Sequence, residues 1–238
     1  MSQIHSHSPE EVQLLALLRE VQSVLTNALN SLDSNSFTKP ETRYLGWAAV
    51  TVNRAADGYL MLRESYRVDA SKLLIRPILE AFFSAAAVMK KRGFLFRKTY
   101  TEILEEKKFH PKNSATETDF QRILKEMEQL FKKDDPIYPI EHKRVDVRYT
   151  AQVAEMLPVY EVAYSTYCLF THGAISAATG QLNKSTDDLD TQFVVRLMIM
   201  MLELLQKYTP AKIPDMAPFL SRLPTPQLHG ATQRQWIT

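Results

Sequence analysis

The feature that most constrains this chain is the helical spacing of its apolar residues, which begins near its first residues. Ser8-Pro9-Glu10-Glu11 has the pattern of a helix start, because Ser8 can cap, Pro9 suits the first helical position and Glu11 completes a capping box. Leucine and valine then recur every three or four residues as far as Leu32. This spacing is typical of an amphipathic helix. We therefore predict a first helix from about residue 9 to residue 32.

Similar signals recur along the rest of the chain. They predict further helices at about residues 40–62, 70–91, 94–109, 115–131, 147–157, 158–178 and 186–208. Pro77 lies inside the third of these patterns, and proline disrupts an ordinary helix by about 3 kcal/mol, so we expect a kink near Leu73 to Pro77. There are only six glycines in 238 residues, and no stretch alternates like a strand. We therefore expect an all-α fold, a multi-helix bundle of about seven helices.

No long linker divides these helices, so we predict a single helical domain at residues 1–208 and a Pro-rich C-terminal tail at 209–238. The tail has five prolines in 29 residues from Pro210 onward, which predicts irregular structure, either wrapped on the body or extended. The stretch from Leu197 to Leu205 is apolar on nearly every face. Such a helix lies in a central core or at a subunit contact, and we favour the core.

Composition and missing motifs exclude several classes of protein. Cys168 is the only cysteine, so no internal disulfide can form, which fits a reducing compartment. The first ten residues lack the features of a signal peptide, and the longest apolar run has six residues where a membrane span needs roughly 20. We therefore expect a cytoplasmic protein with no membrane contact. The chain has no Gly-rich phosphate loop, nucleophile elbow, His-Glu-x-x-His motif or cysteine pair, so we predict no metal and no cofactor.

Two segments carry residues capable of chemistry. Arg76 and Glu80 stand at i and i+4 in an apolar helix, and therefore share one face. Tyr164, Cys168 and His172 are spaced by four in the later Tyr-rich segment. Arginine suits phosphate or carboxylate, glutamate can orient it or act as a base, and histidine moves protons near neutral pH. If the segments pack together, they form a polar pocket between helices.

Two interpretations of this constellation stay open. In the functional one, Arg76, Glu80 and His172 are catalytic, and Tyr164, Asn53 and Asp57 are binding residues. Asn53 and Asp57 stand at i and i+4 of the second predicted helix. They either border the same pocket as Arg76 or face solvent. In the structural one, Arg76 and Glu80 form a helix ion pair worth about 0.3–0.5 kcal/mol when exposed, and the histidine bonds a backbone carbonyl.

A basic stretch from Lys90 to Lys98 holds five cations and two phenylalanines. Cations with aromatic residues can bind single-stranded nucleic acid through charge and stacking, so RNA is a possible partner. Cations also favour the negative end of a helix, where they need no ligand. We favour the second interpretation, because helix ends commonly carry such charges.

The Arg-x-x-x-Glu helix at Arg76, followed by a Tyr-rich helix that ends in His172-Gly173, resembles an uncharacterised group of bacterial all-helical proteins. That group is sometimes compared with the HEPN superfamily, which includes RNA-cutting toxins and antiviral effectors. The resemblance covers about residues 40–205. HEPN nucleases carry an arginine, four to six residues and a histidine on one helix. Only Arg222 and His229 have this spacing here, and the prolines between them exclude a helix.

Three hypotheses of function follow, and the sequence leaves open whether the chain is an enzyme. The first is a bacterial binding or effector protein that uses the polar pocket and acts as a homodimer or with a protein partner. The resemblance implies that such a protein belongs to a defence or toxin–antitoxin system. The second is a HEPN-like metal-independent RNase that uses the same residues. The third is a structural protein–protein interaction bundle without a site.

Overall fold

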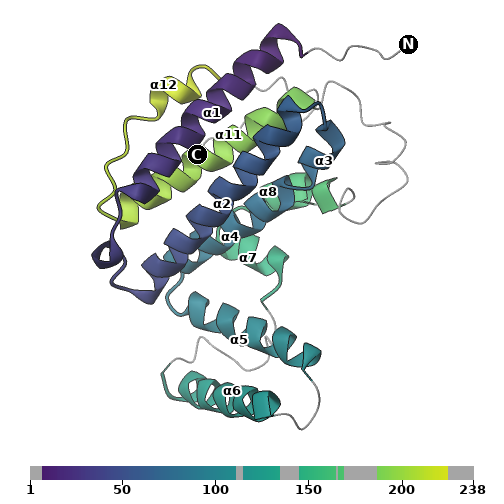
Figure 1. The fold of residues 1–238 in the computed structure, drawn as a ribbon. Coiled ribbons are helices and arrows are strands. Elements are labelled where there is room, and N and C mark those ends of the chain that lie inside the picture. Colours follow the sequence, from purple (N-terminus) through teal and green to yellow (C-terminus); the bar gives the residue numbers. More distant parts are fainter. Residues whose placement is uncertain (1–6, 111–114, 135–144, 165, 169–186, 225–238) are drawn as a thin grey trace.

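The computed structural model describes residues 7–110, 115–134, 145–164, 166–168 and 187–224 of the chain. Within these residues the fold is built of helices, with no strand (Figure 1), so the prediction of an all-α multi-helix fold is confirmed. The helices are α1 (Pro9–Asn30), α2 (Pro40–Glu64), α3 (Val68–Lys72), α4 (Ile75–Lys90), α5 (Phe94–Glu106), α6 (Ala115–Asp134), α7 (Val147–Val153), α8 (Leu157–Val159), α11 (Asp187–Tyr208) and α12 (Ala217–Leu220), with short 3₁₀ turns at Ser34–Ser36 and Lys107–Phe109 and a π-helical turn, η3, at Tyr160–Tyr164.

Helix α1 begins at the residue that its sequence predicts, but the Glu11 carboxylate binds His7 and Arg63 in place of completing the expected capping box. The backbone N–H of Glu11 donates to the Ser8 hydroxyl at 3.1 Å, and Pro9 occupies the first helical position. The cap satisfies one of the backbone donors that every helix start leaves unpaired. The apolar face of α1 is buried, with Leu18, Val21 and Leu25 fully excluded from solvent.

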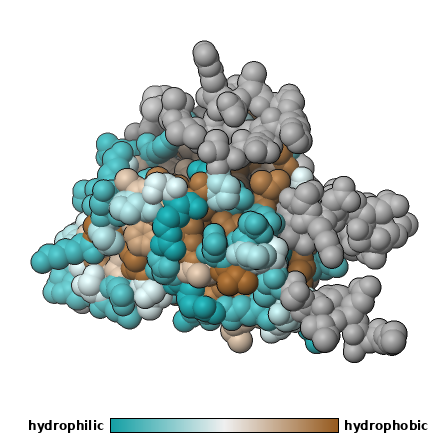
Figure 2. All heavy atoms as spheres, turned by 90° about the horizontal axis from the view of Figure 1, so that it is seen from above, coloured by the Kyte–Doolittle hydropathy of each residue, from teal (hydrophilic) through white to brown (hydrophobic). Residues whose placement is uncertain are grey.

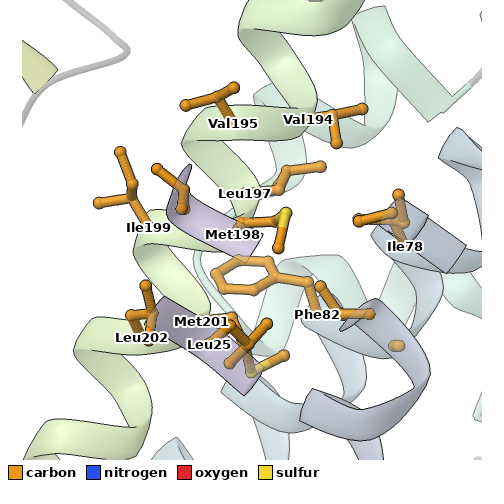
Figure 3. Packing of buried hydrophobic residues seen from close by; sticks show 14 of the residues in the cluster. Leu25, Ile78, Phe82, Val194, Val195, Leu197, Met198, Ile199, Met201 and Leu202 are labelled. Atoms are coloured by element: carbon orange, nitrogen blue, oxygen red, sulfur yellow. The ribbon is translucent and has the colours of Figure 1, made fainter. Parts of the chain in front are cut away.

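The body of the fold is a layer of long helices lying side by side, α1, α2 and α11, with α4 packed against α2 (Figure 1). Helix α7 covers α4, and α5 and α6 form a pair at one end of the molecule. Side chains from α1, α4 and α11 converge in the core, including Leu25, Phe82 and Met198 (Figure 3). The sequence from Leu197 to Leu205 therefore lies in the core of this chain, as we favoured.

The face of the molecule drawn in Figure 2 is mixed in character. Seen from above, hydrophilic residues surround and separate hydrophobic ones (Figure 2). Among the described helices, none is both long enough and apolar enough to cross a membrane.

The expected single helix at 70–91 is wrong, because the structure divides it into α3 and α4. The division lies at Leu73 and Leu74, and Pro77 becomes the third residue of α4. In the first turn of a helix a backbone N–H has no intrahelical acceptor, so proline costs little there. The chain thus starts a new helix instead of kinking an old one, and this start places Arg76 in the first turn of α4.

The first part of the Pro-rich tail is wrapped on the body and is not extended. Ala211, Ile213, Met216 and Leu223 are buried in the same apolar cluster as α1 and α11. Arg222 forms two hydrogen bonds with the carboxylate of Glu20 on α1. The tail also contains the short helix α12, which lies against the outer side of α1 (Figure 1). The domain boundary at residue 208 stays a prediction.

Candidate functional site

The Arg76–Glu80–Tyr164 cluster, which joins α4 to η3, is the best candidate site. Arg76 Nε donates to Glu80 Oε1 at 2.8 Å, as the i, i+4 spacing predicts. Tyr164 donates its hydroxyl hydrogen to the same oxygen at 2.7 Å. The guanidinium carbon of Arg76 also lies 5.5 Å from the centre of the Tyr164 ring, within the range of a cation–π contact. One carboxylate oxygen therefore orients both the arginine and the tyrosine.

Tyr164 is the last residue of the π-helical turn η3. The expected α-helix at 158–178 instead starts as α8, widens into η3 and is helical again at residues 166–168. Such single π turns occur often at functional sites, because they change the face on which the following residues lie. In η3 the rings of Tyr160 and Tyr164 stack with their centres 5.0 Å apart, and the Cys168 side chain lies within hydrogen-bonding reach of Tyr164.

The electrostatics of the cluster favour fixed charges over proton transfer. The hydrogen bond to Glu80 raises the pKa of Arg76 above its ordinary value, so the guanidinium stays cationic. Burial and the hydrogen bond to Glu80 raise the pKa of Tyr164 well above its ordinary value, so the phenol stays protonated and donates. Glu80 accepts from both partners. The trio is thus suited to orient a ligand.

The Arg76–Glu80–Tyr164 cluster is reached by solvent. The Arg76 side chain is 28% exposed and that of Glu80 is 37% exposed, while Tyr164 is buried beside them. Burial of the tyrosine holds one wall of the cluster rigid. The two charged groups remain accessible to a solute.

A second trio, Lys72–Asp190–Tyr167, has the same chemistry but is sealed in the core. Tyr167 donates to Asp190 Oδ1 at 2.5 Å, and Lys72 Nζ lies 3.6 Å from Asp190 Oδ2. The side chains of Lys72 and Asp190 are only 3% and 9% exposed. Beside them, the hydroxyls of Tyr59 and Thr191 are 3.0 Å apart. Burial raises the pKa of Tyr167 well above its ordinary value, as does the nearby charge of Asp190.

The sealed trio is a structural element that joins α3, α11 and residues 166–168. Sequence analysis missed it, because Lys72 and Asp190 are far apart in the chain and neither belongs to a recognisable motif. The only local signal is the group of aspartates, Asp187, Asp188 and Asp190, at the start of α11. An acidic residue there also fits the ordinary preference of helix starts.

The remaining predicted site residues do not join the Arg76–Glu80–Tyr164 cluster in the described structure. Asn53 exchanges hydrogen bonds with Thr26, and the exposed Asp57 accepts one from Gln22 at 3.1 Å. Both therefore bind α1, and the expectation that they border the pocket of Arg76 finds no contact to support it. His172 lies outside the described residues, so its catalytic role stays a prediction.

The basic stretch after α4 is largely used within the protein. Lys90 Nζ binds the carbonyl oxygen of Ala154 at 3.0 Å and the carboxylate of Glu155 at 2.6 Å, while Lys98 pairs with Glu102 at 3.2 Å. Lys91 and Arg97 both donate a hydrogen bond to the hydroxyl of Tyr149 on α7. These bonds connect the α4–α5 corner to α7 and the turn after it, which supports a structural role for the stretch.

Among the described residues, no group of three or more His, Cys, Asp or Glu side chains is arranged to hold a metal ion. Comparison with known proteins adds no assignment. No family matches the chain, and no curated protein or solved structure matches it significantly.

Proposed function

We propose that this chain is a helical binding protein in which Arg76, oriented by Glu80 and Tyr164, contacts the anionic group of a ligand. The observation that carries the proposal is the contrast between the two trios. Each joins a tyrosine, a carboxylate and a cation, but only the trio at Arg76 is open to solvent. Only the open trio can contact a solute, because the side chains of the sealed trio are almost fully excluded from solvent.

The chemistry of the trio indicates the class of ligand. A guanidinium presents donors in a planar fork that matches carboxylate and phosphate groups. Its orientation by Glu80 and by the face of Tyr164 reduces the entropy lost on binding. Because Tyr164 and Arg76 keep their protons, the trio is better suited to recognition than to general acid–base catalysis.

We further propose that the protein is a cytosolic bacterial effector that acts as a homodimer or with a protein partner. Its role would lie in a defence or toxin–antitoxin system. The support is the resemblance described above and the single cysteine, Cys168, which cannot form an internal disulfide.

The test is a calorimetric titration of the full chain with inorganic phosphate, succinate and a short single-stranded RNA. We expect saturable binding of at least one of these probes, weakened by about tenfold or more in Arg76→Gln, as befits the loss of a charged hydrogen bond. Arg222→Gln is the matched control, because Arg222 also pairs with a glutamate but lies outside the Arg76–Glu80–Tyr164 cluster, with its side chain 47% exposed. Its affinity should equal that of the unaltered protein.

Equal binding by Arg76→Gln, or no saturable binding of any probe, would overturn the proposal. The RNA arm also separates the hypotheses of function. Cleavage of the RNA, lost in Arg76→Gln but kept in Arg222→Gln, would replace a binding role with the metal-independent RNase.

A further inference from the structure

The hydroxyl of Tyr149, on α7, lies between two cations. Lys91 Nζ donates to it at 3.2 Å and Arg97 Nη1 donates at 2.9 Å. The guanidinium carbon of Arg97 also lies 4.8 Å from the ring centre. Within the described part of the chain the phenol oxygen thus accepts two charged hydrogen bonds, and its own O–H has no protein acceptor. Both bonds favour the deprotonated, anionic form of the phenol.

Three other tyrosines have the opposite environment, because their hydroxyls donate to carboxylates. Tyr164, Tyr167 and Tyr100 donate to Glu80, Asp190 and Glu128. A carboxylate acceptor stabilises the neutral phenol, and the pKa of Tyr100 is raised to about 12 by burial and by Glu128.

At Tyr149 burial alone would raise the pKa, but Lys91 and Arg97 outweigh it and the pKa is lowered. The acidic residue three positions earlier, Asp146, binds the backbone N–H of Tyr149 at 2.7 Å instead of its hydroxyl.

Tyr149 and its two cationic partners, Lys91 and Arg97, are partly packed into the protein and partly accessible. Arg97 is buried, at 8% exposure, and the Tyr149 ring stacks on buried Phe94 with the ring centres 6.2 Å apart. Tyr149 itself is only partly buried, and so is Lys91. The phenol therefore packs against buried neighbours, while part of the Tyr149 residue remains in contact with solvent.

We propose that Tyr149 is a nucleophilic site of this protein, at which the phenol oxygen accepts a sulfonyl group from an electrophilic donor such as a sulfonyl fluoride. A nucleophile is activated when nearby cations favour its deprotonated form. With a sulfonyl fluoride, the phenol proton passes to solvent, the new O–S bond forms and the S–F bond breaks, with fluoride leaving. Lys91 and Arg97 then face the oxygens of the transferred group, where their charge stabilises it.

The experiment treats the full chain with an aryl sulfonyl fluoride at several pH values and locates the adduct by peptide mass spectrometry. Tyr66 is the internal reference, because it is 45% exposed and carries no cationic donor on its hydroxyl among its described contacts. We expect Tyr149 to be labelled several-fold faster than Tyr66. We also expect the labelling rate of Tyr149 to rise at a lower pH than the labelling rate of Tyr66. Greater exposure alone would produce the opposite order.

Variants at the cations separate activation from mere accessibility. Lys91→Gln should slow labelling of Tyr149 several-fold, whereas Lys91→Arg, which keeps the charge, should retain most of it. Lys98→Gln is the matched control, since Lys98 pairs with Glu102 on the same segment and has no described contact with Tyr149.

Three outcomes would overturn the proposal: labelling of Tyr149 no faster than that of Tyr66, an adduct on Lys91 in place of Tyr149, or an unchanged Tyr149 rate in Lys91→Gln. A circular dichroism melt of each variant ensures that the compared proteins are folded.

Discussion

Tyr164 and Glu80 are joined by a 2.7 Å hydrogen bond although 84 positions separate them in the chain. The bond attaches the π-helical turn η3 to α4. It also holds the Glu80 carboxylate that orients Arg76. A substitution of Tyr164 should therefore alter the position of Arg76, the candidate ligand contact.

We predict that Tyr164→Phe lowers the free energy of unfolding by about 1 kcal/mol, the usual size of one such hydrogen bond, because only the hydroxyl is removed. Urea denaturation measures the change. The control is Tyr66→Phe, which removes a hydroxyl from an exposed residue and should leave stability nearly unchanged. Equal stability of Tyr164→Phe and the unaltered protein would show that the bond contributes nothing.

The sealed trio should respond far more strongly than the open one. Asp190→Ala leaves Lys72 buried without its carboxylate, and breaking a buried ion pair in this way costs about 3–5 kcal/mol. Glu80→Ala removes a carboxylate that is 37% exposed, and we expect a loss of about 2 kcal/mol or less, from its ion pair with Arg76 and its hydrogen bond with Tyr164 together. Urea denaturation of the two variants side by side gives the comparison. A loss at Glu80 as large as that at Asp190 would contradict the distinction between the trios.

The core around Phe82 should be sensitive to truncation. Phe82 is 2% exposed and belongs to the cluster that joins α1, α4 and α11, so Phe82→Ala should cost about 3–5 kcal/mol. Trp47→Ala on α2 is the control, because that side chain is 58% exposed and buries little area. Thermal melting compares them. A similar loss for the two variants would mean that the core lies elsewhere.

Acid should destabilise the protein partly through Glu11. Burial alone would raise the pKa of Glu11, but its bonds with His7 and Arg63 outweigh this, and its pKa in the folded state lies below the ordinary value of 4.5. Between these two values the unfolded chain binds more protons, so stability is full above about pH 4.5 and falls as the pH drops through the folded-state pKa.

Urea denaturation as a function of pH tests this dependence. Glu11→Gln should be less stable near neutral pH, because Arg63 is fully buried and loses its anion. Its stability should also fall less steeply below pH 4.5. Glu10→Gln, at an exposed position of the same helix, should follow the unaltered protein. Parallel pH profiles for Glu11→Gln and the unaltered protein would contradict the prediction.

The sequence by itself determined most of the helices and part of the site. The caps and apolar spacing of α1, and the all-round apolar character of Leu197 to Leu205, are local properties, and the structure agrees with them. The Arg76–Glu80 pair was also predictable, because residues four apart on a helix are neighbours whatever surrounds them.

Only the tertiary structure decided which helices meet and which polar groups are sealed. The contact of Lys72 with Asp190 depends on packing between segments that lie far apart in the chain. Hydrogen bonds such as that of Tyr164 with Glu80 form because neighbouring apolar surfaces hold their helices together. Spacing within one helix carries no information about such contacts, and the same residue types therefore yield one sealed and one solvent-reached trio.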